Sequence, residues 1–156
     1  MPHLSYGLLC DDVRTEAHTN KHIVIGVWDR VTLRDNATPI PPFMVFGRLM
    51  FDDYKGQRIA LDVIPPAGEA KTVFQTKMDV IADPRQETAF PEPNVFLLIG
   101  IRNLTLPMPG KYAIAIKVNG AAVGEIPFYA RQAQPGEAIE SATERPPPSE
   151  QSGSAS

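Results

Sequence analysis

Four side chains near the start of the chain have the residue types of a metal site. They are Asp11, Asp12, His18 and His22, and imidazole and carboxylate groups of this kind bind Zn²⁺ and other transition metals. Gathered around one ion, they would make a metal-dependent hydrolase. The two histidines, however, lie in a polar connection, where their spacing imposes no fixed geometry. We therefore keep the hydrolase as an alternative, and we expect no metal ion and no cofactor.

Cys10 is the single cysteine and the nearest candidate for a nucleophile. A catalytic cysteine requires a partner histidine and a lowered pKa. In a strand, Cys10 shares one face with Leu4, Tyr6 and Leu8, and we expect this face to belong to the core. A free cysteine there packs as a small hydrophobic residue.

Other catalytic patterns are absent from the sequence. Asp52 and Asp53 are adjacent, so on a strand they point to opposite faces and do not share a substrate. The chain contains no Gly-rich phosphate loop, no Gly-x-Ser-x-Gly elbow and no His-Glu-x-x-His motif. We predict that the protein is not an enzyme.

Four aromatic residues suggest a different function. Trp28, Tyr54, Tyr112 and Tyr129 could form a stacking platform for a sugar, as aromatic rows do on carbohydrate-binding sandwiches. Trp28 and Tyr112 could equally fill the core. Binding of a carbohydrate or another small molecule is therefore a second alternative.

The chain has 156 residues, of which 43% are hydrophobic and 21% charged, with a formal net charge of −3. This mildly acidic charge, with no cluster of Lys or Arg, argues against a nucleic-acid partner, which requires a concentrated basic face. The longest apolar run, 95–101, is far shorter than the about 20 residues of a membrane span. We expect neither nucleic acid nor a membrane as a partner.

The first residues lack the features of a secretory signal. Such a signal carries a positive charge followed by about 7–15 apolar residues, whereas here no Lys or Arg precedes Asp11 and Asp12. A single cysteine also suits a reducing compartment. We expect a cytoplasmic protein.

Apolar residues alternate with period two along most of the first 130 residues, which predicts short β-strands. The 16 prolines and 11 glycines favour turns over helices. Strand 23–28 is apolar on both faces and is therefore predicted to be central. The pair Asn119-Gly120 between two alternating strands predicts a type I′ hairpin, because both turn residues need positive φ.

Residues 1–130 are predicted to form an all-β domain, an antiparallel immunoglobulin-like β-sandwich of seven or eight strands, with a closed barrel as the alternative. Residues 131–156 contain one aliphatic residue larger than alanine, Ile139. Ordering each residue costs about 1–2 kcal/mol, and burying a single Ile does not offset that sum. This Pro-, Ser- and Glu-rich segment is predicted to be a disordered tail.

The segment Leu8-Leu9-Cys10-Asp11-Asp12-Val13-Arg14-x-Glu16, followed by Asn20-Lys21 and Ile25-Gly26-Val27, resembles the opening of a family of small bacterial proteins of unknown function. The strand that begins Gly110-Lys111-Tyr112 and the Asn-Gly hairpin are similar to that family more loosely. The resemblance implies an immunoglobulin-like β fold and does not extend into the tail. It implies no activity, substrate or catalytic residue.

Taken together, these patterns predict a non-enzymatic protein-interaction or structural module. The expected partner is another protein, or a second copy of the chain, added at an exposed sheet edge. The candidate interaction surface is the charged connection made of Asp11, Asp12, Arg14, Glu16 and Lys21. Arg14 could clamp a partner's carboxylate with two parallel hydrogen bonds, or pair with Asp12 or Glu16 within the fold.

Overall fold

The computed structural model of the chain describes residues 1–35, 37–53, 56–66, 74–79 and 93–137. The regular elements in these ranges are all β-strands, which confirms the predicted all-β class. Within the same ranges, no helix is long and apolar enough to cross a membrane. Tyr54, most of the predicted loop 83–93 and the tail from residue 138 lie outside the described residues.

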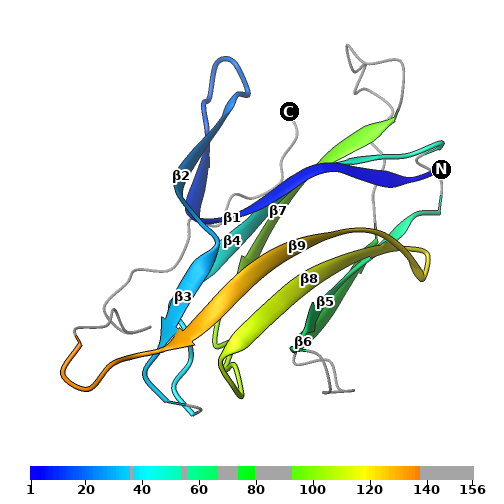
Figure 1. Cartoon of the computed structure of the whole chain (residues 1–156). Helices are drawn as coiled ribbons and strands as arrows, with labels where there is room; N and C mark the ends of the chain where they lie inside the picture. Colours follow the sequence, from blue (N-terminus) through cyan, green and yellow to red (C-terminus); the bar gives the residue numbers. More distant parts are fainter. Residues whose placement is uncertain (36, 54–55, 67–73, 80–92, 138–156) are drawn as a thin grey trace.

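The strands form two sheets (Figure 1). The first sheet has the order β2-β1-β4-β7, and its strands are β1 (His3–Thr15), β2 (His22–Trp28), β4 (Phe43–Met50) and β7 (Asn94–Ile101). The second sheet has the order β3-β9-β8-β5-β6, and its strands are β3 (Arg30–Leu33), β9 (Ala121–Gln132), β8 (Gly110–Val118), β5 (Arg58–Ile64) and β6 (Phe74–Asp79). Neighbouring strands are antiparallel, except that β3 runs parallel to β9.

The described ranges contain nine strands, whereas the sequence predicts seven or eight. The additional strand is β3, whose four residues are too few to show an alternation. Its position is set by pairing, because Val31 lies opposite Ala130 and Leu33 lies opposite Gln132 of β9. Leu33 is buried in the core.

The larger hydrophobic core takes side chains from both sheets. The first sheet contributes Leu9, Phe43, Val45 and Leu49, and the second contributes Leu61, Tyr112, Ile114, Ile116 and Phe128. Their period of two places one face of each strand inward. The β8–β9 hairpin turns at Asn119, with φ of 51°, and Gly120, with φ of 85°, which confirms the predicted turn with two positive φ values.

A smaller hydrophobic cluster forms around the other face of β4. Its buried members are Cys10, Val13, Met44 and Phe46. β4 is therefore buried on both faces, because its alternate residues Phe43 and Val45 belong to the larger core.

The inward face of β1 differs from the sequence prediction. The pairing of β1 with β4 shifts register between Leu4 and Tyr6, and such a shift changes which residues share a face. Leu4 packs against the larger core, whereas Cys10 belongs to the smaller cluster and Tyr6 is 42% exposed. The predicted shared face is therefore confirmed for Leu8 and Cys10 and is wrong for Leu4.

The position of β2 also differs from the prediction. Instead of being central, β2 is an end strand of its sheet. Its inward residues Val24 and Trp28 pack against the two clusters, while Ile23, Ile25 and Val27 are exposed. The apolar pattern on both faces of β2 therefore belongs to an end strand with three exposed apolar side chains.

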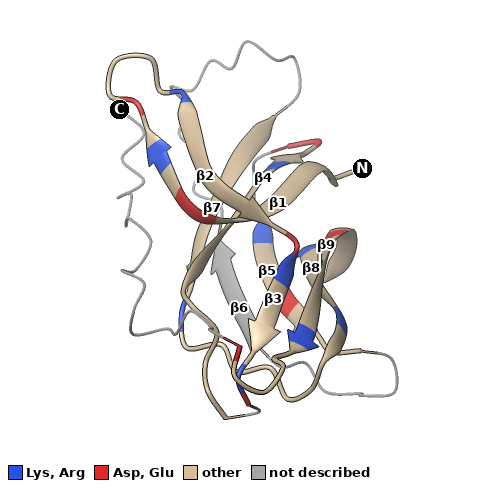
Figure 2. Cartoon of the chain, turned by 60° about the vertical axis from the view of Figure 1, so that its left-hand side comes forward, with Lys and Arg blue, Asp and Glu red and all other residues tan. Residues whose placement is uncertain are grey.

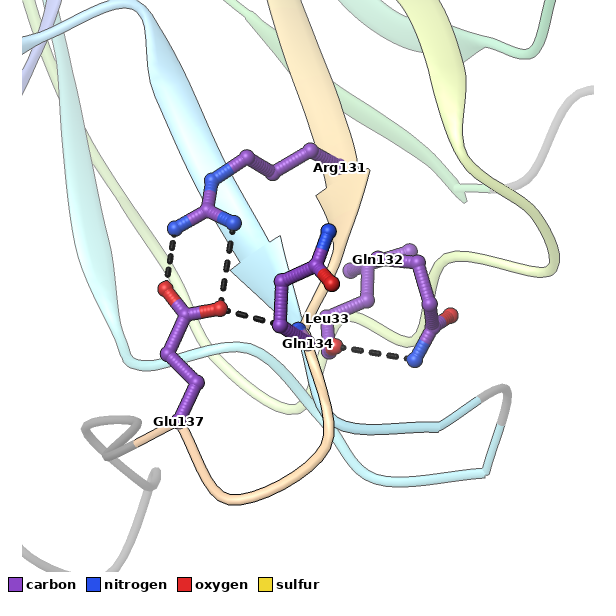
Figure 3. A network of polar contacts seen from close by, with 5 residues as sticks. All are labelled: Leu33, Arg131, Gln132, Gln134 and Glu137. Carbon is purple, nitrogen blue, oxygen red and sulfur yellow. Dashed lines mark hydrogen bonds and ion pairs between the residues drawn. The ribbon is translucent and has the colours of Figure 1, made fainter.

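Figure 3 shows the loop that follows β9. The guanidinium of Arg131 donates hydrogen bonds to both carboxylate oxygens of Glu137, and the amide of Gln134 donates to the same carboxylate at 2.9 Å. Gln132 Nε2 donates to the carbonyl of Leu33 in β3 at 3.2 Å. Arg131 and Gln132, assigned to the tail in the sequence analysis, therefore belong to the sheet.

Candidate interaction surface

The five residues of the predicted surface all lie on the hairpin formed by β1 and β2. Asp11, Asp12 and Arg14 are in β1, while Glu16 and Lys21 close the turn. The amide of Glu16 donates to the carbonyl of Lys21 at 2.8 Å, and this hydrogen bond fixes the turn. Figure 2 shows the charged positions gathered toward the free end of this hairpin.

Arg14 pairs within the fold, as one of the predicted alternatives states. Its Nε lies 3.4 Å from Asp12 Oδ2, and Asp12 Oδ1 accepts a hydrogen bond from the amide of Val13 at 2.9 Å. Glu16 instead accepts a hydrogen bond from the hydroxyl of Thr19. Because the Arg14 side chain is largely exposed, an ion pair of this kind contributes only about 0–1 kcal/mol to stability.

Gly26 allows the hairpin to twist away from the rest of the first sheet. It has a positive φ of 68°, a conformation that residues with a side chain rarely adopt. A Cβ at position 26 would also collide with the carboxylate of Asp11. The hairpin geometry therefore depends on glycine at this position.

Three apolar side chains of β2 are exposed next to the charged residues. Ile23, Ile25 and Val27 are 53%, 42% and 62% exposed. In the β1–β2 register, Ile25 lies opposite Asp12 and Ile23 lies opposite Arg14. We call these three side chains the β2 row. The sequence predicts its charged neighbours as a surface, whereas its apolar alternation predicts a buried central strand.

His22 packs toward the smaller hydrophobic cluster. Its ring meets Phe96 edge-on at a centroid distance of 4.5 Å and Phe46 at 5.6 Å. Nδ1 lies 3.0 Å from the hydroxyl of Thr15 on the opposite strand. The His22 ring thus packs the hairpin against the face formed by β4 and β7.

Acid is expected to weaken this attachment. Burial lowers the pKa of His22 below its ordinary value of 6.5, so the fold favours the neutral ring. Its contribution to stability is complete above the pKa of the unfolded chain, about 6.5, and is lost as the pH falls toward the lowered folded-state pKa. Urea unfolding at a series of pH values measures this, and His22→Gln should remove this part of the pH dependence. Identical pH profiles for the two proteins would contradict the assignment.

The four predicted metal ligands do not converge. His22 faces Phe96, while His18 is exposed on the turn. In the parts of the chain that the structure describes, no group of three or more His, Cys, Asp or Glu side chains is placed to hold a metal ion. The hydrolase stays an untested alternative.

Cys10 is fully buried, as a packing role requires. Burial, and next the charges of Asp11 and Asp12, raise the pKa of the Cys10 thiol to about 11. The thiol lies 3.8 Å from the carbonyl of Met44. At neutral pH the group is therefore protonated, and a protonated thiol is a poor nucleophile.

The aromatic residues of the predicted sugar platform do not share a surface. Tyr112 is buried and stacks on Phe128 at a centroid distance of 5.3 Å. Trp28 meets the edge of Phe43 at 5.1 Å and is half-buried. Of the three platform residues that the structure describes, Tyr129 is the exposed one.

Comparison with known families gives one match that spans the hairpin and both sheets. The model of a family of unknown function, DUF6941, matches residues 5–131. The chain belongs to this family. The DUF6941 match begins in β1 and ends in β9, so it includes the hairpin and the strands of both sheets. It agrees with the predicted membership of a family of unknown function. No curated protein matches the chain.

One solved structure similar to this DUF6941 chain is that of the Pseudomonas fluorescens alkylpurine DNA glycosylase AlkC bound to DNA containing an abasic site analog. The identity is 9% and the TM-score 0.41, and the match covers 83% of this chain. The chain spans 30% of the glycosylase. A likeness this distant assigns no ligand to the DUF6941 chain.

The comparison nevertheless corrects the partner prediction. The partner predicted from the sequence is a protein or a second copy at a sheet edge, with nucleic acid excluded. The distantly similar structure is a DNA-bound protein, and this finding overturns the exclusion of nucleic acid. The exclusion of nucleic acid relied on the net charge of −3, which is a property of the whole chain. Binding depends instead on the local charge of a surface.

Proposed function

We propose that this chain is a non-enzymatic protein-interaction module, and that the side chains of the β2 row form the centre of its contact surface. The exposure of three apolar side chains of one strand, Ile23, Ile25 and Val27, carries the proposal. Ile23 and Ile25 share one face of β2. Scattered exposed apolar residues are ordinary, but several exposed apolar residues on one short strand point to a site of interaction.

The charged neighbours of the row fit the rim of such a surface. Protein interfaces combine an apolar centre with a polar, solvent-accessible edge. Asp12 and Arg14 lie beside Ile25 and Ile23 in the β1–β2 register, and Arg14 presents a largely exposed guanidinium. The partner that fits is a protein with an apolar patch and a carboxylate placed to reach Arg14.

The composition of β2 gives a second reason for a covering partner. Its sequence, His-Ile-Val-Ile-Gly-Val-Trp, contains no Lys, Glu, Asp or Pro. Proteins usually protect an end strand with such residues, and an unprotected apolar strand is prone to aggregate. The hairpin is thus expected to be more soluble when its partner is bound.

The finer topology of the fold is also a proposal. We infer an immunoglobulin-like arrangement of the two sheets, supported by Tyr112 near the start of β8. Its hydroxyl donates a hydrogen bond to the carbonyl of Met108 at 2.7 Å, four residues upstream. A buried tyrosine bonded back to the preceding corner is a feature of immunoglobulin-like domains.

A matched pair of isoleucines tests the proposed surface. A photo-crosslinking residue at position 25 identifies the partner in cells, and calorimetry then measures binding of the purified partner to wild type, Ile25→Lys and Ile64→Lys. Ile64 is 39% exposed on the other sheet and serves as the control. Burying an Ile side chain stabilises by about 1.5–3 kcal/mol, so Ile25→Lys should weaken binding about tenfold or more.

Comparison of the affinities of the two isoleucine variants tests whether the β2 row is the contact surface. The Ile64→Lys variant should bind like wild type. Equal binding by wild type and Ile25→Lys, or equal losses in both variants, would refute the β2 row as the contact surface. Light scattering of the isolated chain supplies the further control that Ile25→Lys has not simply changed its association state.

A further inference from the structure

The outer face of the second sheet carries an exposed aromatic ring between two cations. Tyr129 of β9 is 50% exposed. Lys111 of β8 lies directly opposite it on one side, and Arg30 of β3 lies opposite it on the other. We propose that Tyr129, Arg30 and Lys111 bind single-stranded nucleic acid, with a base stacked on Tyr129 and phosphates held by the two cations.

The register across three strands brings these side chains together. Tyr112 and Phe128, the neighbours of Lys111 and Tyr129, are paired and buried in the core. Because successive side chains alternate between faces, Lys111 and Tyr129 both point outward. Directly paired residues in antiparallel strands have Cβ atoms about 4.5–5.5 Å apart, so the ammonium group can reach a phosphate next to a base on the ring.

The side chains beside Tyr129 on the outer face of the sheet are small. The next pair across β8 and β9 is Ala113 and Pro127, both small, and Pro127 is exposed. A planar base that stacks on Tyr129 therefore meets no bulky side chain from this row. A ring of this kind on the outer face of a sheet is the feature that single-strand binding proteins use for stacking.

The charged groups around the Tyr129 ring leave the Arg30 guanidinium available to a phosphate. Arg30 forms an ion pair with Asp29 at 3.9 Å, and both side chains are largely exposed. Such a pair contributes about 0–1 kcal/mol, so a phosphate can compete for the guanidinium. Arg131, the next outward residue of β9, is held by Glu137 (Figure 3) and is not part of the site.

The chemistry favours single strands over the other ligands with which an aromatic ring stacks. In a duplex the bases stack on each other and are not free to cover Tyr129. A neutral sugar would gain from the ring but not from Arg30 and Lys111. An unpaired nucleotide chain uses all three side chains, and its binding should fall steeply with salt.

Fluorescence anisotropy with a labelled oligothymidine of about twelve nucleotides in about 50 mM salt tests the proposal. We expect Tyr129→Ala to weaken binding about tenfold, the usual effect of losing one stacked base. Tyr6→Ala is the matched control, because Tyr6 is 42% exposed on the first sheet, and it should bind like wild type. Arg30→Ala combined with Lys111→Ala should weaken binding and reduce the salt dependence.

Circular dichroism of each variant confirms that these surface substitutions leave the fold intact. Four results would overturn the proposal: no binding by wild type at low salt, wild-type affinity in Tyr129→Ala, equal losses in Tyr129→Ala and Tyr6→Ala, or equal affinity for a duplex of the same length. The last result would assign the binding to the cations alone.

Discussion

Replacing Phe128 with alanine is expected to lower the free energy of unfolding by about 3–5 kcal/mol, the usual cost of removing a buried aromatic ring. Phe128 is fully buried and belongs to the larger core. Its ring stacks on Tyr112 at 5.3 Å and meets Trp28 edge-on at 5.9 Å. The substitution therefore leaves a cavity where side chains of both sheets meet.

Urea unfolding followed by circular dichroism measures this change. Tyr129→Ala is a suitable control because Tyr129 is the next residue in β9 but points outward, and an exposed site usually changes stability by less than about 0.5 kcal/mol. A loss below about 1 kcal/mol in Phe128→Ala would mean that the two sheets do not enclose a common core.

Gly26→Val is expected to destabilise the hairpin and to abolish partner binding. A β-branched residue at a φ of 68° is strained, at a cost of about 1–3 kcal/mol. The added side chain would also collide with Asp11. Both effects act at the position where the hairpin twists, so the β2 row would no longer be presented in the same way.

Gly56→Val separates strain from collision. Gly56 has nearly the same φ, 69°, but a Cβ there has no atom within 4 Å. In urea unfolding, Gly56→Val should show the cost of strain alone, and Gly26→Val should show a larger loss. Equal losses in the two variants would mean that the contact between Asp11 and Gly26 does not shape the hairpin.

The parts of the fold that the sequence predicts well are those that depend on local patterns. The hairpin at Asn119-Gly120 follows from turn chemistry, and the burial of Cys10 follows from its apolar neighbourhood. Two features depend on distant pairing and escape such patterns. The parallel contact of β3 with β9 joins residues about a hundred positions apart. The register shift after Leu4 places Leu4 against the larger core, whereas Leu8 and Cys10 pack in the smaller cluster.

The candidate surface was predicted in part for a similar reason. Asp11, Asp12, Arg14, Glu16 and Lys21 are close in sequence, so any hairpin places them together. The β2 row was missed because an apolar pattern on both faces is the same for a central strand and for an end strand with exposed apolar side chains. Only the strand order distinguishes the two.

Hydrogen–deuterium exchange of the chain with and without its purified partner tests the β2 row most directly. If the row is the centre of the contact surface, amides of β2 (His22–Trp28) should become protected in the complex, while those of β5 (Arg58–Ile64) should exchange at the same rate as in the free chain. Protection confined to strands of the second sheet, with β2 unchanged, would contradict the account.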